Sequence, residues 1–362
     1  MYRAALNTVG RNRVMRFTHR LLSFGVVGAV VLLGVLSVTR SGGSRDAGPA
    51  GEQGTTTAVL ETAVPETAVP ETAEPAAAIT TTTISQVAAS ALDPSLAPVC
   101  GPVEGIVPGG AGCRIIAYYG NPQSKKMGVL GATPKADMLA RLAAKTQTWQ
   151  TADPATPTKC ALELIAVFAQ AEPGPKNLHR ARMSASKIDE VLRWAREAKC
   201  LLILDVQVGW SSVADEVPFL APWLKEPDVH LGLDPEWDMP VGVIPGEKVG
   251  RMSAADVQFG IDFVSDVVKA NNLPPKLVVV HRFQDFMVTN PELIRPTPEI
   301  RLVVNADGFG PPETKFVTFR IAQVGMPTAL TGFKLFIKND KPILQPGDVL
   351  PLVPQPVFIN YQ

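Results

Sequence analysis

The chain has 362 residues, with 34 basic and 34 acidic side chains, four cysteines and no net charge. The balanced charge, without a basic run after residue 100, argues against nucleic acid as a partner. The lack of a glycine-rich phosphate loop argues against nucleotide cofactors, and the lack of a Gly-x-Ser-x-Gly elbow argues against a serine hydrolase of that type.

The first residues carry the pattern of a membrane anchor. Residues 1–20 contain arginines but no acidic residue, and the apolar run Leu21–Val38 follows them. At 1.5 Å per residue this run spans roughly 27 Å, close to the thickness of a bilayer core. We therefore predict a cytoplasmic basic N-terminus (1–20), a single-pass signal-anchor (21–39) in the cell membrane, and an extracytoplasmic remainder. A cleaved signal peptide is the alternative, although a poor cleavage site follows Val38.

Residues 40–99 are rich in Ala, Thr, Pro, Glu and Gly, and they contain a tandem repeat that begins at Glu61, Glu66 and Glu71. Proline at every fifth position of the repeat prevents a helix. Few apolar side chains are present to offset the entropy cost of ordering. We predict a disordered stalk.

The four cysteines fit an exported domain with two disulfides. Cys100 and Cys113 bracket a Gly/Pro-rich turn, whereas Cys160 and Cys200 each precede an apolar run. The expected pairs are Cys100–Cys113 and Cys160–Cys200, although the sequence alone leaves other pairings open. No CxxC or clustered His/Cys pattern is present, so we expect no metal site and no cofactor.

Residues 100–362 alternate short apolar runs with amphipathic stretches. The predicted strands are Arg114–Tyr119, Leu162–Phe168, Leu201–Val206, His230–Leu233, Leu277–His281, Leu302–Asn305, Phe333–Phe336 and Val357–Tyr361. The clearest helices are Pro134–Thr148, Ser184–Lys199, Ser211–Leu224, Ser253–Asn271 and Pro312–Val324. Eight strands with intervening helices predict an α/β fold of the (β/α)₈ barrel type. A doubly wound sheet is the rival, but the turn after Tyr118 matches neither GxGxxG nor the P-loop.

Polar residues follow several of these strands, where the active site of such a barrel lies. The pairs Asp205/Gln207, Asp234/Glu236 and Asn305/Asp307 have i, i+2 spacing, so both members of each pair should face the barrel mouth. His281 and Lys334 end two further strands. His281 is equally consistent with a structural role, and we expect Lys334 to pair with a carboxylate rather than to form a Schiff base. The null hypothesis is that these residues are solvated loop starts and helix caps.

Three aromatic residues, Tyr119, Trp210 and Trp237, are expected on loops at the rim of the same mouth. Aromatic faces beside acidic and amide groups suit carbohydrate. We therefore assign a substrate-binding role to Tyr119, Asp205, Gln207, Trp210, Trp237, His281, Asn305, Asp307 and Lys334. Ordinary packing beneath loops is the alternative for the tryptophans.

Asp234-Pro235-Glu236 resembles the Asp-x-Glu of chitinase-type and secreted muramidase-type barrel glycosidases. That resemblance implies that Glu236 is the general acid and that Asp234 assists it. It covers few residues, because Val229 and Gly232 stand where the longer chitinase signature has aspartates. Most of Cys113–Tyr361, including the segment Tyr118-Tyr-Gly-Asn-Pro, is also similar to exported bacterial barrel proteins without an established activity.

These observations predict a membrane-anchored glycoside hydrolase that acts on cell-wall or extracellular polysaccharide, with Glu236 and Asp234 as catalytic residues. Two alternatives remain open. One is a barrel that binds glycan or protein without catalysis. The other is a hydrolase dependent on a divalent metal held by Asp205, Asp234, Glu236, Asp307 and His281.

Overall fold

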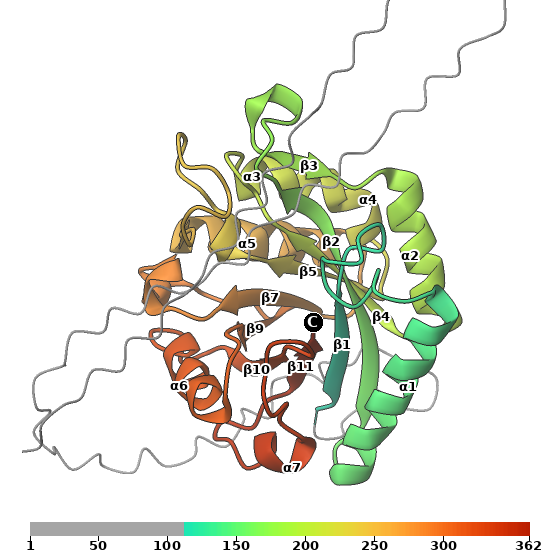
Figure 1. The fold of residues 1–362 in the computed structure, drawn as a ribbon. Coiled ribbons are helices and arrows are strands. Elements are labelled where there is room, and N and C mark those ends of the chain that lie inside the picture. Colours follow the sequence, from blue (N-terminus) through green and yellow to red (C-terminus); the bar gives the residue numbers. More distant parts are fainter. Residues whose placement is uncertain (1–111) are drawn as a thin grey trace, which may run out of the picture. The chain divides into compact units, whose positions relative to one another are not determined.

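The computed structural model describes residues 112–362, which form a closed barrel of eight parallel strands (Figure 1). The barrel strands are β1 (Arg114–Gly120), β2 (Thr158–Ala169), β4 (Leu201–Val206), β5 (Val229–Leu233), β7 (Lys276–Arg282), β9 (Ile300–Ala306), β10 (Leu330–Leu335) and β11 (Phe358–Tyr361). Each pairs in parallel with its neighbours, and β1 closes the ring by pairing with both β2 and β11. The predicted α/β class and closed parallel barrel are confirmed, and every predicted strand overlaps an observed one.

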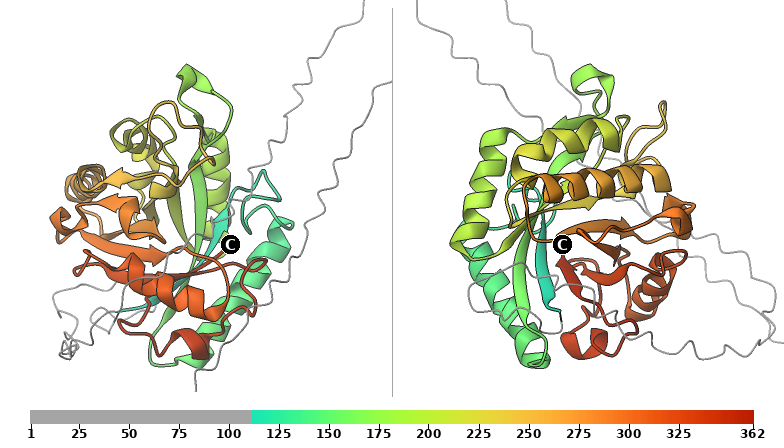
Figure 2. Two further views of the ribbon diagram at one scale, coloured as in Figure 1. Left: turned by 60° about the vertical axis from the view of Figure 1, so that its left-hand side comes forward. Right: turned by 180° about the vertical axis from the view of Figure 1, so that it is seen from behind.

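Helices surround the strands in all three views (Figures 1 and 2). They are α1 (Lys135–Ala152), α2 (Ala185–Glu197), α3 (Val213–Glu216), α4 (Ala221–Leu224), α5 (Ala254–Ala270), α6 (Pro312–Ala322) and α7 (Pro346–Val349). The strand β3 (Arg180–Arg182) pairs antiparallel with β2, and β6 (Met252–Ser253) pairs with β8 (Val288–Thr289) outside the barrel.

Two predicted helix starts are N-capped by the expected serines. Ser184 Oγ accepts a hydrogen bond from the backbone N–H of Lys187 at the start of α2. At the start of α5, Ser253 and Asp256 form a reciprocal capping box, in which each side chain accepts from the other residue's backbone N–H. These bonds satisfy N–H groups that a helix leaves without partners, so local sequence alone places both starts.

The predicted helix Ser211–Leu224 is not continuous. The structure has the short helix α3, a 3₁₀ turn over Val217–Leu220, and the short helix α4. Pro218 and Pro222 explain the interruption, because a proline lacks the N–H that continues a helix and its ring clashes with the preceding turn. Between β7 and β9 the chain forms short 3₁₀ turns and β8 rather than a barrel helix.

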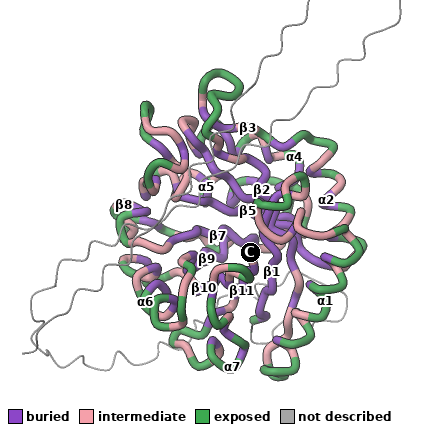
Figure 3. Tube along the Cα trace, viewed as in Figure 1, coloured by how far each residue is buried: buried purple, intermediate pink, exposed green. Residues whose placement is uncertain are grey.

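Side chains alternate between two apolar layers. Inward-facing positions such as Ile203, Val279, Val303 and Phe358 fill the barrel interior. Their neighbours, such as Leu204 and Val280, pack outward against the helices. Figure 3 shows the buried strands at the centre and exposed residues on the outer faces of the helices.

The Cys160–Cys200 disulfide is present and joins residues just before the apolar parts of β2 and β4, as predicted. The other predicted pair includes Cys100, which lies outside the described residues. The basic segment (1–20), the signal-anchor (21–39) and the stalk (40–99) lie outside them as well, and these assignments stay predictions. Within residues 112–362, no helix combines the length and apolar character needed to cross a membrane.

We predict that replacing both Cys160 and Cys200 by serine lowers the free energy of unfolding by about 2–4 kcal/mol. The disulfide closes a loop with a sequence separation of 40, and its loss lets the unfolded chain gain entropy. Urea denaturation measures this change. A reducing agent should therefore destabilise the wild type more than the variant. Equal stability of the two proteins would contradict the prediction.

Candidate functional site

The C-terminal half of the barrel interior is polar, in contrast to the apolar half below it. Alternate strands contribute to one layer of such a barrel. Here β1, β4, β7 and β10 contribute Tyr119, Asp205, His281 and Lys334, and the other four strands contribute Glu163, Gly232, Asn305 and Asn360 to the next layer. All eight are buried. Charges buried this deeply require partners, so their contacts define the site.

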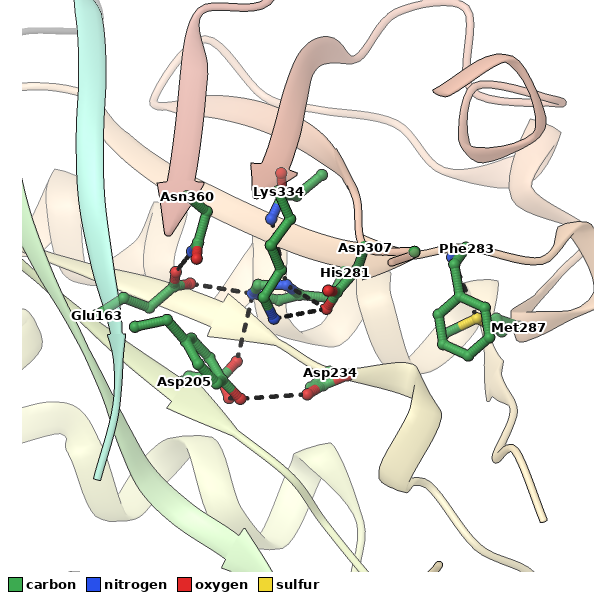
Figure 4. A network of polar contacts seen from close by, with 12 residues as sticks. Glu163, Asp205, Asp234, His281, Phe283, Met287, Asp307, Lys334 and Asn360 are labelled. Atoms are coloured by element: carbon green, nitrogen blue, oxygen red, sulfur yellow. Dashed lines mark hydrogen bonds and ion pairs between the residues drawn. The ribbon is translucent and has the colours of Figure 1, made fainter. Parts of the chain in front are cut away.

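A chain of ion pairs crosses this interior. Glu163 Oε1 lies 3.0 Å from His281 Nε2, and Asp307 Oδ2 lies 3.0 Å from His281 Nδ1. The Lys334 ammonium donates to the same Asp307 oxygen at 2.8 Å, as expected for a buried lysine. Figure 4 shows these four side chains converging from different strands at the centre of the barrel.

A second group of hydrogen bonds joins Tyr119, Asp205, Asp234 and Gln207. The Tyr119 hydroxyl donates to Asp205 Oδ2 at 3.0 Å and lies 3.4 Å from Asp234 Oδ2. Gln207 Nε2 donates to the Tyr119 hydroxyl at 3.0 Å, and its Oε1 accepts from the backbone N–H of Ala169. Tyr119 therefore lies in β1 inside the barrel, not on a rim loop as predicted. Lys334 Nζ stands 4.0 Å from the centre of its ring.

Asp234 and Glu236 do not extend strand β5, although their i, i+2 spacing predicted a shared direction on a strand. Strand β5 ends at Leu233, and Pro235–Trp237 forms a 3₁₀ turn. Proline after Asp234 explains the break, since it cannot donate to a neighbouring strand. Asp234 remains buried, whereas Glu236 is half-buried and its side chain makes no hydrogen bond or ion pair with another described residue.

Three carboxyl groups in this region have raised pKa values. Burial, followed by the charge of Asp234, raises the pKa of Asp205 well above its usual value, and burial also raises the pKa of Asp234. Loss of hydration, followed by the negative charges of Asp234 and Asp307, raises the pKa of Glu236 to about 8. Carboxylates crowded together in a dry environment cannot all ionise, so protons remain in this group at neutral pH.

The pKa values of Asp307 and Lys334 in the ion-pair chain are shifted toward their charged forms. Burial alone would raise the pKa of Asp307, but the Lys334 charge and the hydrogen bond from His281 lower it. Burial alone would lower the pKa of Lys334, yet the charges of Asp307 and Asp234 raise it. The site thus combines an ionised carboxylate deep in the barrel with a protonated one at the mouth.

The two tryptophans lie apart from this polar network. Trp210 packs against His179, with ring centres 4.1 Å apart, and its indole N–H donates to the Val243 carbonyl. The Trp237 carbonyl accepts from the Gly209 N–H, which joins the loops after β4 and β5. Both indoles are half-buried. The structure brings together the other predicted site residues, with Asn305 Nδ2 lying 3.4 Å from His281 Nδ1.

Glu163 and Asn360 belong to the network but were not predicted as site residues. Asn360 Nδ2 donates to Glu163 Oε2, which orients the carboxylate that faces His281. A signal for Glu163 was present, because it is the only charged residue in the apolar run Ala161–Phe168. An ionised side chain within a buried strand demands a partner. Glu163 was not predicted because it lies in the middle of a strand, whereas the predicted site residues follow strand ends.

Glycine at two inward positions leaves room for these polar groups. A Cβ at Gly232 would lie 2.9 Å from Asp205 Oδ1 and 3.2 Å from Glu163 Oε1. A Cβ at Gly332 would lie 2.8 Å from Asn305 Oδ1. Both glycines lie in strands, so the requirement is space rather than backbone conformation.

Other buried charges outside this network serve the fold. Lys276 Nζ donates to the carbonyls of Glu226 and Val229, and Glu216 accepts from the guanidinium groups of Arg180 and Arg182. By contrast, five buried carboxylate or amide oxygens, three in the two inner layers and two just above them, have no hydrogen-bond partner within residues 112–362. They are Oδ1 of Asp205, Asp234, Asn305, Asp307 and Asn360. Unsatisfied acceptors of this kind distinguish the mouth as the candidate functional site.

Comparison with known proteins assigns the chain to no family. No protein-family model matches the chain, and no curated protein matches it significantly.

We predict that Gly232→Ala destabilises the protein by about 1–3 kcal/mol, because the added methyl group pushes on the Asp205 and Glu163 carboxylates. Gly347→Ala is the matched control, since a Cβ there meets nothing within 4 Å. Urea denaturation of both variants measures the difference. Equal stability of the two variants would show that the barrel interior accommodates a methyl group at Gly232.

Proposed function

We propose that the barrel is a glycoside hydrolase acting on cell-wall or extracellular polysaccharide, with Glu236 as the general acid. The observation that carries this proposal is the position of Glu236. It is a half-buried carboxyl group in the turn after β5, next to the buried Asp234, and its side chain has no hydrogen-bond partner within residues 112–362. A general acid must reach solvent and substrate while it retains a proton, and this position supports both requirements.

The reaction would begin with transfer of the Glu236 proton to the glycosidic oxygen, while the bond from that oxygen to the anomeric carbon breaks. Positive charge then develops on the sugar ring. The neighbouring Asp234 serves two purposes in this proposal. Its negative field holds the proton on Glu236 before the reaction and stabilises the positive charge that follows. Water supplies the hydroxyl group of the new reducing end, and the proton that it releases restores the acid form of Glu236.

Aromatic residues near the strand ends support carbohydrate as the substrate. Trp237 follows Glu236 directly and is half-buried. Phe309, which is 39 % exposed, lies after β9 and packs edge-on against Phe336 after β10, with ring centres 5.8 Å apart. Sugars present apolar C–H faces, which stack on such rings, beside hydroxyl groups that bind carboxylates and amides.

We predict that Glu236→Gln lowers turnover by about 10²–10⁴-fold while substrate binding persists, because glutamine keeps the shape and loses the proton. Soluble peptidoglycan fragments and an oligosaccharide panel serve as substrates, with new reducing ends as the readout. Glu247→Gln is the matched control, since Glu247 is an exposed glutamate in the same loop. It should retain full activity.

The same panel separates catalysis from binding alone. Sugar binding by the wild type and by Glu236→Gln with equal affinity, and no reducing ends from either protein, would contradict the hydrolase. That result would leave a non-catalytic glycan-binding barrel.

We predict an alkaline limit to activity set by Glu236, whose pKa of about 8 lies above its usual value. A general acid must be protonated, so kcat/KM should hold through neutral pH and fall as pH rises through about 8. A profile of kcat/KM between pH 5 and 10 measures the limit. A fall that begins near pH 5 would assign the essential proton to a different, unperturbed group.

A further inference from the structure

Glu163, Asp205 and His281 direct three ligand atoms at one point inside the barrel. These atoms all lie within 4.8 Å of one another. His281 Nε2 is 3.0 Å from Glu163 Oε1 and 3.8 Å from Asp205 Oδ1. The three residues come from β2, β4 and β7, and all are fully buried. Figure 4 shows Glu163, Asp205 and His281 pointing toward one another, with Asp234 to one side.

We propose that this cluster binds one divalent transition metal ion, such as Mn²⁺ or Zn²⁺, through Glu163 Oε1, Asp205 Oδ1 and His281 Nε2. One imidazole nitrogen with two carboxylate oxygens suits these ions, whereas Ca²⁺ and Mg²⁺ prefer oxygen ligands alone. The site is separate from Glu236 and Asp234, and the inference does not depend on glycoside hydrolysis.

The Asp205 carboxylate points to a missing partner. Its side chain is fully buried, and its Oδ1 has no hydrogen-bond donor in the described part of the chain. Leaving a buried polar oxygen unsatisfied costs free energy. A proton on His281 Nε2 would satisfy Glu163 but not Asp205, because 3.8 Å is too long for a hydrogen bond. A cation at the point between the three atoms satisfies all of them.

The far side of each ligand is already held in place. His281 Nδ1 contacts Asp307 Oδ2, Asp205 Oδ2 accepts from the Tyr119 hydroxyl, and Glu163 Oε2 accepts from Asn360 Nδ2. A metal ion would displace the proton from His281 Nε2, while the proton on Nδ1, donated to Asp307, would keep the ring oriented. Metal sites in proteins commonly orient their ligands through such outer hydrogen bonds, and the carboxylate–histidine–metal arrangement is one of them.

Space and charge at the cluster also suit a cation. Gly232 faces Asp205 Oδ1 and Glu163 Oε1 without a side chain of its own. Asp234 and Asp307 add further carboxylates nearby. The Lys334 ammonium offsets part of this charge, and Asp307 Oδ2 holds it at 2.8 Å. The negative charge that remains attracts a divalent ion.

The test measures metal bound to the purified, tag-free, full-length protein after chelator treatment and dialysis against MnCl₂ or ZnCl₂. We expect one ion per chain. Asp205→Asn and His281→Gln should weaken binding more than about 10-fold, and Asp307→Asn should weaken it by about 10–100-fold as the loss of an outer partner. Asp153→Asn is the control. Asp153 pairs with Arg114 at the opposite end of the barrel, so its loss should leave binding unchanged.

Near-ultraviolet circular dichroism checks that each variant is folded. If the ligand variants fail to fold, pulsed electron paramagnetic resonance of Mn²⁺ in the wild type decides the question, with coupling to one imidazole nitrogen expected. No stoichiometric Mn²⁺ or Zn²⁺ in the wild type, equal binding by folded Asp205→Asn and Asp153→Asn, or bound Mn²⁺ without nitrogen coupling would each overturn the proposal.

Discussion

The ion-pair chain Glu163–His281–Asp307–Lys334 is the constraint on which the upper half of this barrel depends. It connects β2 with the adjacent strands β7, β9 and β10, from which β2 is separated by β4 and β5 in the ring. Burying these charges is expensive, and only the mutual contacts offset the cost. Removing one member leaves another charge without its partner, typically at about 3–5 kcal/mol. Stable closure of the upper half of the barrel therefore depends on the pairing of these four side chains.

Barrel closure accounts for the division between a structural half and a chemical half. Alternation sends every second side chain inward, and the lower positions are filled by residues such as Ile203 and Val303. Above them the same rows continue with Asp205 and Asn305. A packed apolar floor excludes water, so the charges above it interact strongly and their pKa values shift. The apolar half thus shifts the pKa values of the polar half.

The two proposals place their functional groups at different depths along the barrel axis. Glu236 is half-buried in a short turn, and the negative charges of Asp234 and Asp307 raise its pKa. Glu163 and Asp205 are fully buried beside His281, with ligand atoms of the three residues within 4.8 Å of one another. Tyr119 connects the levels, because its hydroxyl contacts both Asp205 and Asp234. A change at either level therefore alters the electrostatics of the other.

The sequence by itself determined the parts of this protein that depend on local patterns. Apolar runs located all eight strands, and serine caps located the starts of α2 and α5. The placement of Cys160 and Cys200 before neighbouring strands predicted their disulfide, and i, i+2 polarity predicted that Asp205 and Asn305 face inward. Each of these features depends on residues within one or two turns of chain or on strand adjacency, so periodicity and capping chemistry suffice.

Only the tertiary structure decided which polar residues meet. Glu163, hidden within an apolar run, became a partner of His281 because β2 and β7 face each other across the closed barrel. Tyr119 moved from the expected rim to the interior, since the register of β1 turns it inward. Glu236 left the strand because Pro235 starts a 3₁₀ turn. Such contacts join residues far apart in sequence, and barrel register sets them, which no local pattern encodes.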